Sequence, residues 1–174
     1  FGTQHPLFED FVKNHLPFSL TGAQERVLRE VKTDLCSGQQ MNRLLQGDVG
    51  SGKTIVAFLS VMMAVDNGYQ ASLMAPTEIL AIQHYIGLSE LADKIGLEIG
   101  ILTGSTTTKE RRILHKKLQN GETKLLVGTH ALIEDVVKYK NLGLVIIDEQ
   151  HRFGVAQRAK LQDKGKENPH VLVM

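Results

Sequence analysis

An eight-residue segment in the first third of the chain carries the residue types needed to bind a phosphate chain. It reads GDVGSGKT over residues 47–54 and fits the pattern G-x-x-x-x-G-K-[ST], in which glycines let backbone N–H groups surround phosphate oxygens. Lys53 adds a positive charge for the β- and γ-phosphates, and the Thr54 hydroxyl suits Mg²⁺. The residues predicted to bind the nucleotide phosphates here are Gly47, Gly50, Ser51, Gly52, Lys53 and Thr54.

A pair of acidic residues ends an apolar segment much later in the chain. Residues 142–147 read LGLVII, and Asp148 and Glu149 follow directly. One carboxylate is placed to hold Mg²⁺, and the other is placed to orient and deprotonate an attacking water. An acidic pair after a strand is weak support when taken alone, because helices often begin with acids. Together with the phosphate segment, the pair predicts an NTPase whose catalytic residues are Lys53, Asp148 and Glu149.

The elements that position these residues are predicted from the apolar pattern, which alternates between strand and helix. Strands are expected at 42–46, 71–75, 97–102, 124–127, 142–147 and 171–174, and helices at 23–35, 53–66, 78–94, 107–120 and 156–162. Apolar strands that alternate with helices indicate an α/β fold with a central parallel sheet covered on both faces. Ligands of such sheets bind at the carboxyl ends of the strands, so the loops there are the expected site.

The amino-terminal segment is predicted to be irregular. Pro6 and Pro17 interrupt residues 1–20, which we interpret as a connection that arrives from an upstream segment. The helix that follows has a clear start signal, because Thr21 and Gln24 form a T-x-x-Q capping box.

The bulk composition indicates a soluble globular protein and limits the partners. The chain has 174 residues, 42% of them hydrophobic and 22% charged, and no apolar stretch of 18 residues, so no membrane partner is expected. Its net charge of +1 argues against DNA binding by bulk electrostatics, so any DNA contact must be local. The single cysteine, Cys36, cannot form an internal disulfide, which favours a reducing, cytoplasmic location.

The four residues at 148–151, Asp-Glu-Gln-His, resemble the DExH signature of superfamily 2 helicases. Residues 20–24 are similar to the Q motif of that superfamily, and this similarity implies that the Gln24 amide reads the adenine edge of ATP. The alternative is that Gln24 only completes the capping box. The resemblance also implies that His151 contacts the nucleotide and couples its γ-phosphate to the DNA-facing segments.

Three further segments, at 75–81, 102–105 and 127–132, resemble loops that hold the phosphates of a DNA strand in that superfamily. Their small residues expose N–H groups, and their hydroxyls can donate to phosphate. The residues implied to bind DNA are Pro76, Thr77, Gly104, Ser105, Thr129 and His130. Each segment taken alone would also fit an ordinary helix cap or turn. The basic helix at 107–120 could touch DNA as well, although a solvated face is the expected reading.

Within superfamily 2 the sequence resembles the RecG family of bacterial ATP-dependent DNA helicases. The similar segments include 44–54, 128–132 and 148–155, of which the last, with its Gln-His-Arg-Phe-Gly run, is the most specific. Members of that family remodel branched DNA, including stalled forks and Holliday junctions. The resemblance therefore implies an ATP-dependent DNA helicase with ATP and Mg²⁺ as cofactors and branched or duplex DNA as partner.

The resemblance also implies a domain organisation. Residues 17–174 correspond to the first RecA-like motor domain, with a three-layer α/β fold, and residues 1–16 to a linker or the tail of an upstream segment. A second RecA-like domain and a wedge domain of the same full-length protein are the implied partners. The chain alone is expected to bind nucleotide weakly with little turnover. The strand at 171–174 is expected between the phosphate-loop strand and the strand before Asp148.

Two alternatives stay open from the sequence. Transcription-repair coupling translocases share the Gly-Asp-Val-Gly and Arg-Phe-Gly elements, so the chain could belong to a motor that acts beside RNA polymerase. The second alternative is a nucleotide-gated DNA-binding module that does not hydrolyse ATP.

Overall fold

The structure is a computed structural model of the chain, and it describes all residues except 3, 17–18, 46–50 and 149–154; the side chains of Ser51 and Val155 are also outside the described part. Six strands form one sheet: β1 Asn42–Leu44, β2 Gln70–Met74, β3 Ile99–Leu102, β4 Leu125–Gly128, β5 Leu142–Ile147 and β6 His170–Val173. The helices are α1 Pro6–Asn14, α2 Gly22–Cys36, α3 Ser51–Asp66, α4 Glu78–Asp93, α5 Thr108–Asn120, the 3₁₀ helix η1 His130–Ile133, and α6 Val155–Gln162.

The strands are all parallel and lie in the order β1-β6-β5-β2-β4-β3. The predicted α/β class with a central parallel sheet is therefore confirmed. The expected position of β6 is also confirmed, since its residues pair with β1 on one side and with β5 on the other, as in Asn42↔Val171 and Val145↔Val171. The last strand in the chain thus lies inside the sheet rather than at its edge.

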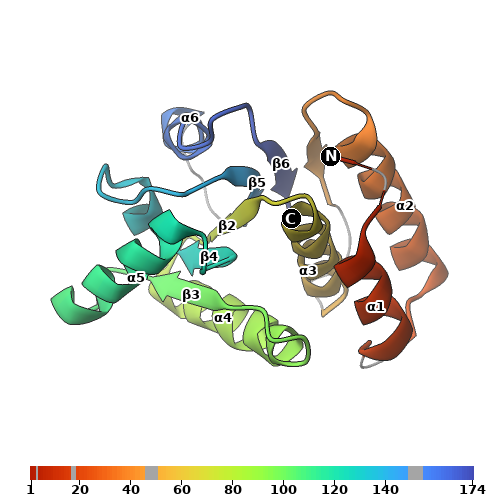
Figure 1. The fold of residues 1–174 in the computed structure, drawn as a ribbon, viewed down its shortest axis with the longest axis horizontal. Helices are drawn as coiled ribbons and strands as arrows, with labels where there is room; N and C mark the ends of the chain where they lie inside the picture. Colours follow the sequence, from red (N-terminus) through yellow and green to blue (C-terminus); the bar gives the residue numbers. More distant parts are fainter. Residues whose placement is uncertain (3, 17–18, 46–50, 149–154) are drawn as a thin grey trace.

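Helices cover both faces of the sheet, which gives three layers (Figure 1). On one face α1, α2, α3 and α4 pack over alternate strand residues such as Leu73 and Ile146. On the other face α5, η1 and α6 pack over residues such as Leu126 and Val145. This alternation follows from the strand period of two, which sends successive side chains to opposite faces.

The helix α3 is the centre of the first face. Its residues from Ile55 to Ala64 include no apolar side chain more than 3% exposed, as expected for a helix that is apolar nearly all round. Phe58 packs edge-on against Phe11 of α1, with ring centroids 5.2 Å apart. Gly68, with φ of +82°, allows the turn that leads into β2.

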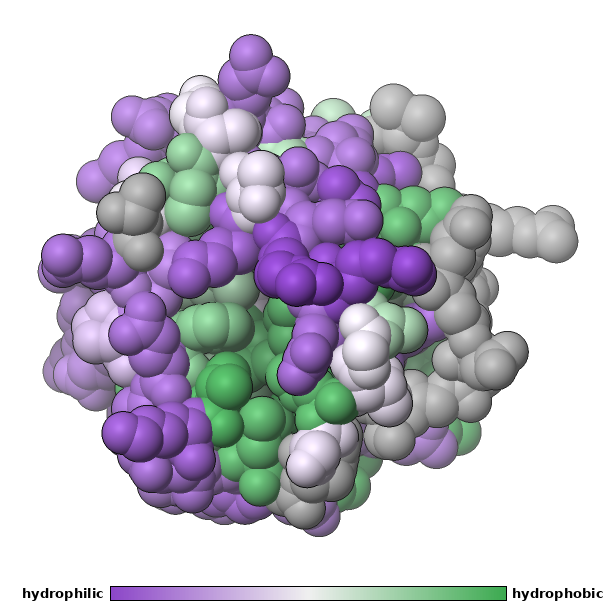
Figure 2. Space-filling view, turned by 90° about the vertical axis from the view of Figure 1, so that its right-hand side faces the viewer, coloured by the Kyte–Doolittle hydropathy of each residue, from purple (hydrophilic) through white to green (hydrophobic). Residues whose placement is uncertain are grey.

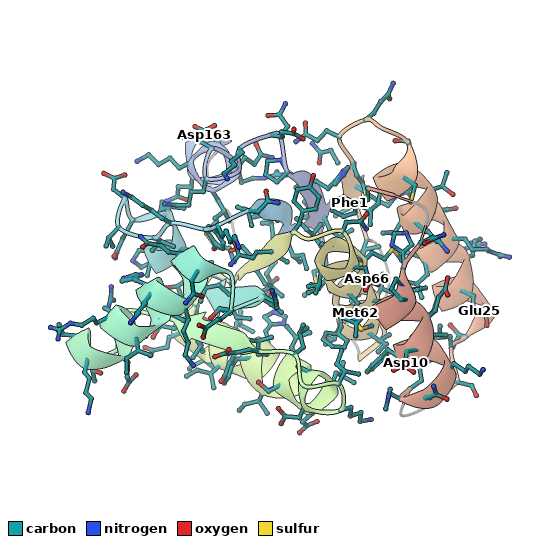
Figure 3. All side chains as sticks on the ribbon, viewed as in Figure 1. Phe1, Asp10, Glu25, Met62, Asp66 and Asp163 are labelled. Atoms are coloured by element: carbon teal, nitrogen blue, oxygen red, sulfur yellow. The ribbon has the colours of Figure 1, made fainter. Side chains whose placement is uncertain are left out.

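The amino-terminal segment is not irregular, and the sequence prediction for it is wrong. Pro6 begins α1, where a missing N–H costs nothing because the first helical N–H groups have no partner inside the helix. The next two N–H groups, of Leu7 and Phe8, donate to the carboxylate of Asp66 at 2.9 and 3.0 Å. Figure 3 shows Asp66 at the end of α3, facing α1. Phe11 is fully buried, so α1 is part of the packed unit.

Threonine caps define three helix starts, of which those at Thr21 and Thr77 were expected, while Thr107 was predicted as the first residue of its helix rather than as its cap. Thr21 accepts from the N–H of Gln24 and Gln24 accepts from the N–H of Thr21, so the capping box is present. Thr77 caps α4 and Thr107 caps α5, each by accepting an N–H bond of 3.2 Å three residues later. The short helix η1 was not expected from the sequence, because four residues carry no periodic pattern.

The side of the molecule that carries α1 and α2 is mostly polar, with an apolar area in its lower half (Figure 2). None of the helices in the described part of the chain has both the length and the apolar character needed to cross a membrane.

Candidate nucleotide and DNA site at the carboxyl edge of the sheet

The carboxyl ends of the six parallel strands lie along one edge of the sheet, and the strand order divides this edge in two. The nucleotide half is formed by β1, which precedes the phosphate segment, by β6, and by β5, which precedes Asp148. The DNA half is formed by β2, β4 and β3, which precede the three predicted DNA segments. The halves meet where β5 pairs with β2. Residues that the sequence separates widely are therefore brought to one edge.

The phosphate segment is described only from its helical end. Gly47, Gly50, Glu149 and His151 lie outside the described residues, so their predicted roles stay predictions. The helix α3 begins at Ser51, and this start places Gly52, Lys53 and Thr54 in its first turn. The positive end of the helix dipole and its unpaired N–H groups favour an anion at that position. The prediction that these residues bind phosphate stays a prediction, and the observed helix start is compatible with it.

Gln24 lies directly against the phosphate segment. A Cβ added to Gly52 would sit 2.8 Å from Nε2 of Gln24, so a larger residue at position 52 would displace the end of the Gln24 side chain. The Oε1 atom of Gln24 meanwhile accepts the N–H of Thr21 at 2.9 Å. Gln24 thus completes the capping box, and its amide nitrogen also lies next to Gly52 in the nucleotide half of the edge. Adenine recognition by Gln24 stays a prediction.

Asp148 follows β5 and is nearly enclosed. Its residue is 5% exposed, and its backbone N–H donates to the carbonyl of Met74 at 3.0 Å, which extends the β5–β2 pairing. Its Oδ2 atom lies 2.8 Å from Nε2 of His84, which comes from α4. No pattern in the sequence connects these two residues, because His84 fits no ligand spacing. Only the packing of α4 beside β2 reveals the contact.

The oxygen donors at the nucleotide half fit Mg²⁺. The Thr54 hydroxyl and the Asp148 carboxylate are hard oxygen ligands, the kind that Mg²⁺ prefers. In the part of the chain that the structure describes, no three His, Cys, Asp or Glu side chains gather as a metal cage. Mg²⁺ is usually bound by one or two protein oxygens and completed by phosphate oxygens and water.

The predicted DNA residues lie at the ends of three neighbouring strands. Thr77, Gly104, Ser105 and His130 are exposed, and Pro76 is half-buried. Thr129 differs, since its residue is only 5% exposed and its hydroxyl has no hydrogen-bond partner among the described residues. The exposed four could reach a DNA backbone as the structure stands. The Thr129 hydroxyl does not face solvent here.

The basic helix α5 is not simply a solvated face. Arg111 donates to the carbonyls of Thr106 and Thr103 at 3.1 and 2.9 Å, and it pairs with Glu134 at 3.2 Å. Arg111 therefore fixes the segment that follows β3. The other basic residues of the helix that were considered for DNA contact are Lys109, Arg112, Lys116 and Lys117, of which Lys117 pairs with Glu98.

The sequence predicts that His84, His115 and His170 are ordinary surface or satisfied residues, because none of them fits a ligand spacing. His170 is buried, and its Nδ1 accepts the N–H of Met41 at 2.8 Å. Burial lowers the pKa of His170 to about 4, and burial likewise lowers the pKa of His115. Both imidazoles are therefore neutral near pH 7. His84 is satisfied as well, and its partner is Asp148.

Comparison with known proteins decides the family. Residues 21–172 match the family described as DEAD/DEAH box helicase. The chain belongs to this family. Its sequence relatives include proteins named ATP-dependent DNA helicase RecG, such as that of Aquifex aeolicus, 56% identical over 160 residues, and that of Streptococcus pneumoniae, 56% identical over 163 residues. These matches cover 91% and 94% of this chain but only 20% and 24% of the relatives.

Solved structures agree with this DEAD/DEAH membership. A structure of RecG bound to a three-way DNA junction superposes with a TM-score of 0.84 at 46% identity, covering 98% of this chain and 22% of that one. The Pyrococcus furiosus Hef helicase domain superposes with a TM-score of 0.65 at 23% identity, covering 96% and 33%, and shows the shared fold alone. The predicted RecA-like helicase fold is confirmed.

Proposed function

We propose that this chain is the ATP-binding motor domain of a RecG-like ATP-dependent DNA helicase, with the domain itself at residues 17–174. The intact protein is proposed to remodel branched DNA, such as stalled forks and Holliday junctions. The observation that carries the proposal is the divided sheet edge. The start of α3 and Asp148 lie on its nucleotide half, and exposed loop residues lie on the half beside it. Similarity to RecG helicases over more than nine-tenths of the chain supports the assignment.

The nucleotide half supplies the groups for ATP hydrolysis. Lys53 and the first N–H groups of α3 bind the phosphates, while the Thr54 hydroxyl and the Asp148 carboxylate are the proposed ligands of Mg²⁺. When bound, Mg²⁺ neutralises charge on the β- and γ-phosphates. Glu149 is proposed to take a proton from the attacking water, and Gln24 to bind the adenine edge.

The remaining roles complete the proposed site. Gly47, Gly50, Ser51 and Gly52 offer backbone N–H groups to the phosphates, and His151 links the γ-phosphate to the DNA half. The DNA contacts are proposed at Pro76, Thr77, Gly104, Ser105, Thr129 and His130.

The weak overall charge fits a motor that depends on further domains. A net charge of +1 cannot hold DNA by bulk attraction. Similarity to RecG helicases supports a second RecA-like domain and a wedge domain of the same full-length protein as proposed partners. Residues 1–16 are proposed to connect to an upstream segment, and their helix α1 also packs on α3. The proposed location is the cytoplasm.

The proposal is tested by ATP turnover of the intact protein on forked DNA. We expect DNA-stimulated hydrolysis that Glu149→Gln abolishes while ATP binding is kept, because the base is lost but the phosphate site is not. The chain alone is expected to bind ATP weakly and to turn it over slowly. Nucleotide binding without any hydrolysis in the intact protein would favour the DNA-binding module instead. Dependence on RNA polymerase would favour the coupling translocase.

A further inference from the structure

His84 is held in place against the acidic residue of the nucleotide half. Its Nε2 lies 2.8 Å from Oδ2 of Asp148, and the two side chains are 16% and 7% exposed. A hydrogen bond shielded to this degree holds both groups in one orientation, because water competes poorly for either partner. The bond uses one oxygen of the carboxylate and so restricts the positions that the other oxygen can take.

The element that carries His84 belongs to the other half of the edge. The helix α4 begins at Glu78 directly after the predicted DNA residues Pro76 and Thr77, and Thr77 caps it by accepting the N–H of Leu80. His84 lies about two helical turns further along, at roughly 1.5 Å per residue. A helix of this length moves as one rigid body. The His84 bond therefore attaches Asp148 to the helix that carries the first DNA segment.

The attachment continues to the second DNA segment. Glu78 accepts a hydrogen bond from the hydroxyl of Thr103 at 3.0 Å. The same hydroxyl accepts the N–H of Ser105 at 3.2 Å, and the Thr103 carbonyl accepts from Arg111. Side-chain bonds thus connect Asp148 to Ser105 through a single rigid helix.

We infer that His84 is a positioning residue for Mg²⁺ and nucleotide binding, and that it links the Mg²⁺-binding carboxylate to the DNA segments through α4. This inference rests on the proposed function, because it takes Asp148 as a metal ligand. Hydrogen bonds to a ligating carboxylate orient it, and their loss weakens metal affinity by about 10–100-fold. A shift of α4 on DNA binding reaches Asp148 through the same bond, so the two sites are coupled.

The test uses the intact protein, a β,γ-imido analogue of ATP that is not hydrolysed, and a series of Mg²⁺ concentrations. In His84→Leu, the Mg²⁺ concentration that gives half-maximal analogue binding should rise about 10-fold or more. Analogue binding in EDTA should stay within about 2-fold of wild type, because the phosphate contacts remain. His84→Gln should stay close to wild type, since its amide can donate from the same distance. Gln83→Leu, an exposed neighbour on α4, is the matched control.

A second readout addresses the coupling. The affinity for a forked oligonucleotide is measured with and without Mg²⁺ and the analogue. The ratio of the two affinities should shrink toward one in His84→Leu and should persist in His84→Gln. If His84→Leu fails to fold, His84→Asn replaces it, because its amide is too short to reach Asp148.

The outcomes distinguish the role of His84 from the proposed function. An unchanged Mg²⁺ midpoint in His84→Leu, or equal shifts in His84→Leu and His84→Gln, overturns the inference and leaves the proposed function intact. Absence of Mg²⁺-dependent analogue binding in the wild type overturns the proposed function itself.

Discussion

The Nε2 atom of His84 lies 2.8 Å from Oδ2 of Asp148 although 64 residues separate them in the chain. The contact crosses the boundary between the two halves of the sheet edge, because Asp148 follows β5 and α4 follows β2. It shows how a parallel sheet places groups of different function side by side. Other contacts between residues that are distant in the sequence predict effects of substitutions and of pH that can be measured on the chain itself.

Gly52→Ala should disturb Gln24 and the start of α2. The new Cβ would lie 2.8 Å from the Gln24 amide nitrogen, which must then leave its position. We expect an interaction free energy of about 0.5–1 kcal/mol between Gly52→Ala and Gln24→Ala in a double-mutant cycle followed by urea unfolding. Gly87→Ala, in a helical position with nothing within 4 Å, should be additive with Gln24→Ala. Additivity in both cycles would refute the contact.

Asp66→Ala should weaken the attachment of α1. The carboxylate accepts the N–H groups of Leu7 and Phe8, and the loss of such a cap costs about 1–2 kcal/mol of unfolding free energy. Urea unfolding measures the loss, and proteolysis of the amino-terminal segment should become faster. Asp93→Ala is the matched control, because Asp93 also ends a helix, is exposed and makes no side-chain hydrogen bond among the described residues. Equal stability of the two variants would contradict the cap.

Acid should destabilise the fold in part through His170. The pKa of His170 is lowered to about 4, mainly by burial and also by the nearby amino-terminal amine, while Asp34 opposes the shift. Between about pH 6.5 and 4 the unfolded chain binds a proton that the folded chain does not, so the free energy of unfolding falls as pH falls.

The control for this prediction is His170→Asn. Its Oδ1 can still accept the N–H of Met41, but it does not titrate. Unfolding measured between pH 7 and pH 4.5 should show a smaller slope in this variant. A residual slope is expected, because burial also lowers the pKa of His5 and of His115. An unchanged slope would rule out His170 as a contributor.

Gly128→Ala should destabilise the DNA half of the edge. A Cβ at Gly128 would collide with the backbone carbonyl of Leu102 on β3 and approach the Leu132 side chain of η1 to 2.8 Å. Because backbone cannot move aside cheaply, we expect a loss of about 2–3 kcal/mol in thermal or urea unfolding. Gly104→Ala, which meets nothing within 4 Å, should change stability by less than about 0.5 kcal/mol. Comparable losses in the two variants would show that the close approach is not the cause.

Much of this architecture could be predicted because its signals are local. The apolar periods placed all six strands and five of the helices within a few residues of their observed bounds. Capping threonines marked the helix starts at Thr21 and Thr77, because a side chain three residues from its partner acts without tertiary contacts. The alternation of elements was enough to predict a parallel sheet.

The errors arose where packing decided the outcome. Pro6 suggested a break but begins α1, whose first N–H groups are capped by Asp66, far away in the sequence. Arg111 lies on the basic helix that was predicted to face solvent, yet its guanidinium donates a hydrogen bond to the carbonyl of Thr103. No periodic pattern in the sequence predicts either contact, because each depends on how two elements pack against one another.

The sequence by itself determined the alternating elements and the fold class and supplied the residues predicted to bind phosphate and Mg²⁺, since glycines, caps and apolar periods act over a few residues. The tertiary structure alone decided the pairing of β5 with β2, the approach of Gln24 to Gly52 and the bond from His84 to Asp148. These depend on strand order and helix packing, which bring distant residues within a few ångströms and which no local pattern encodes.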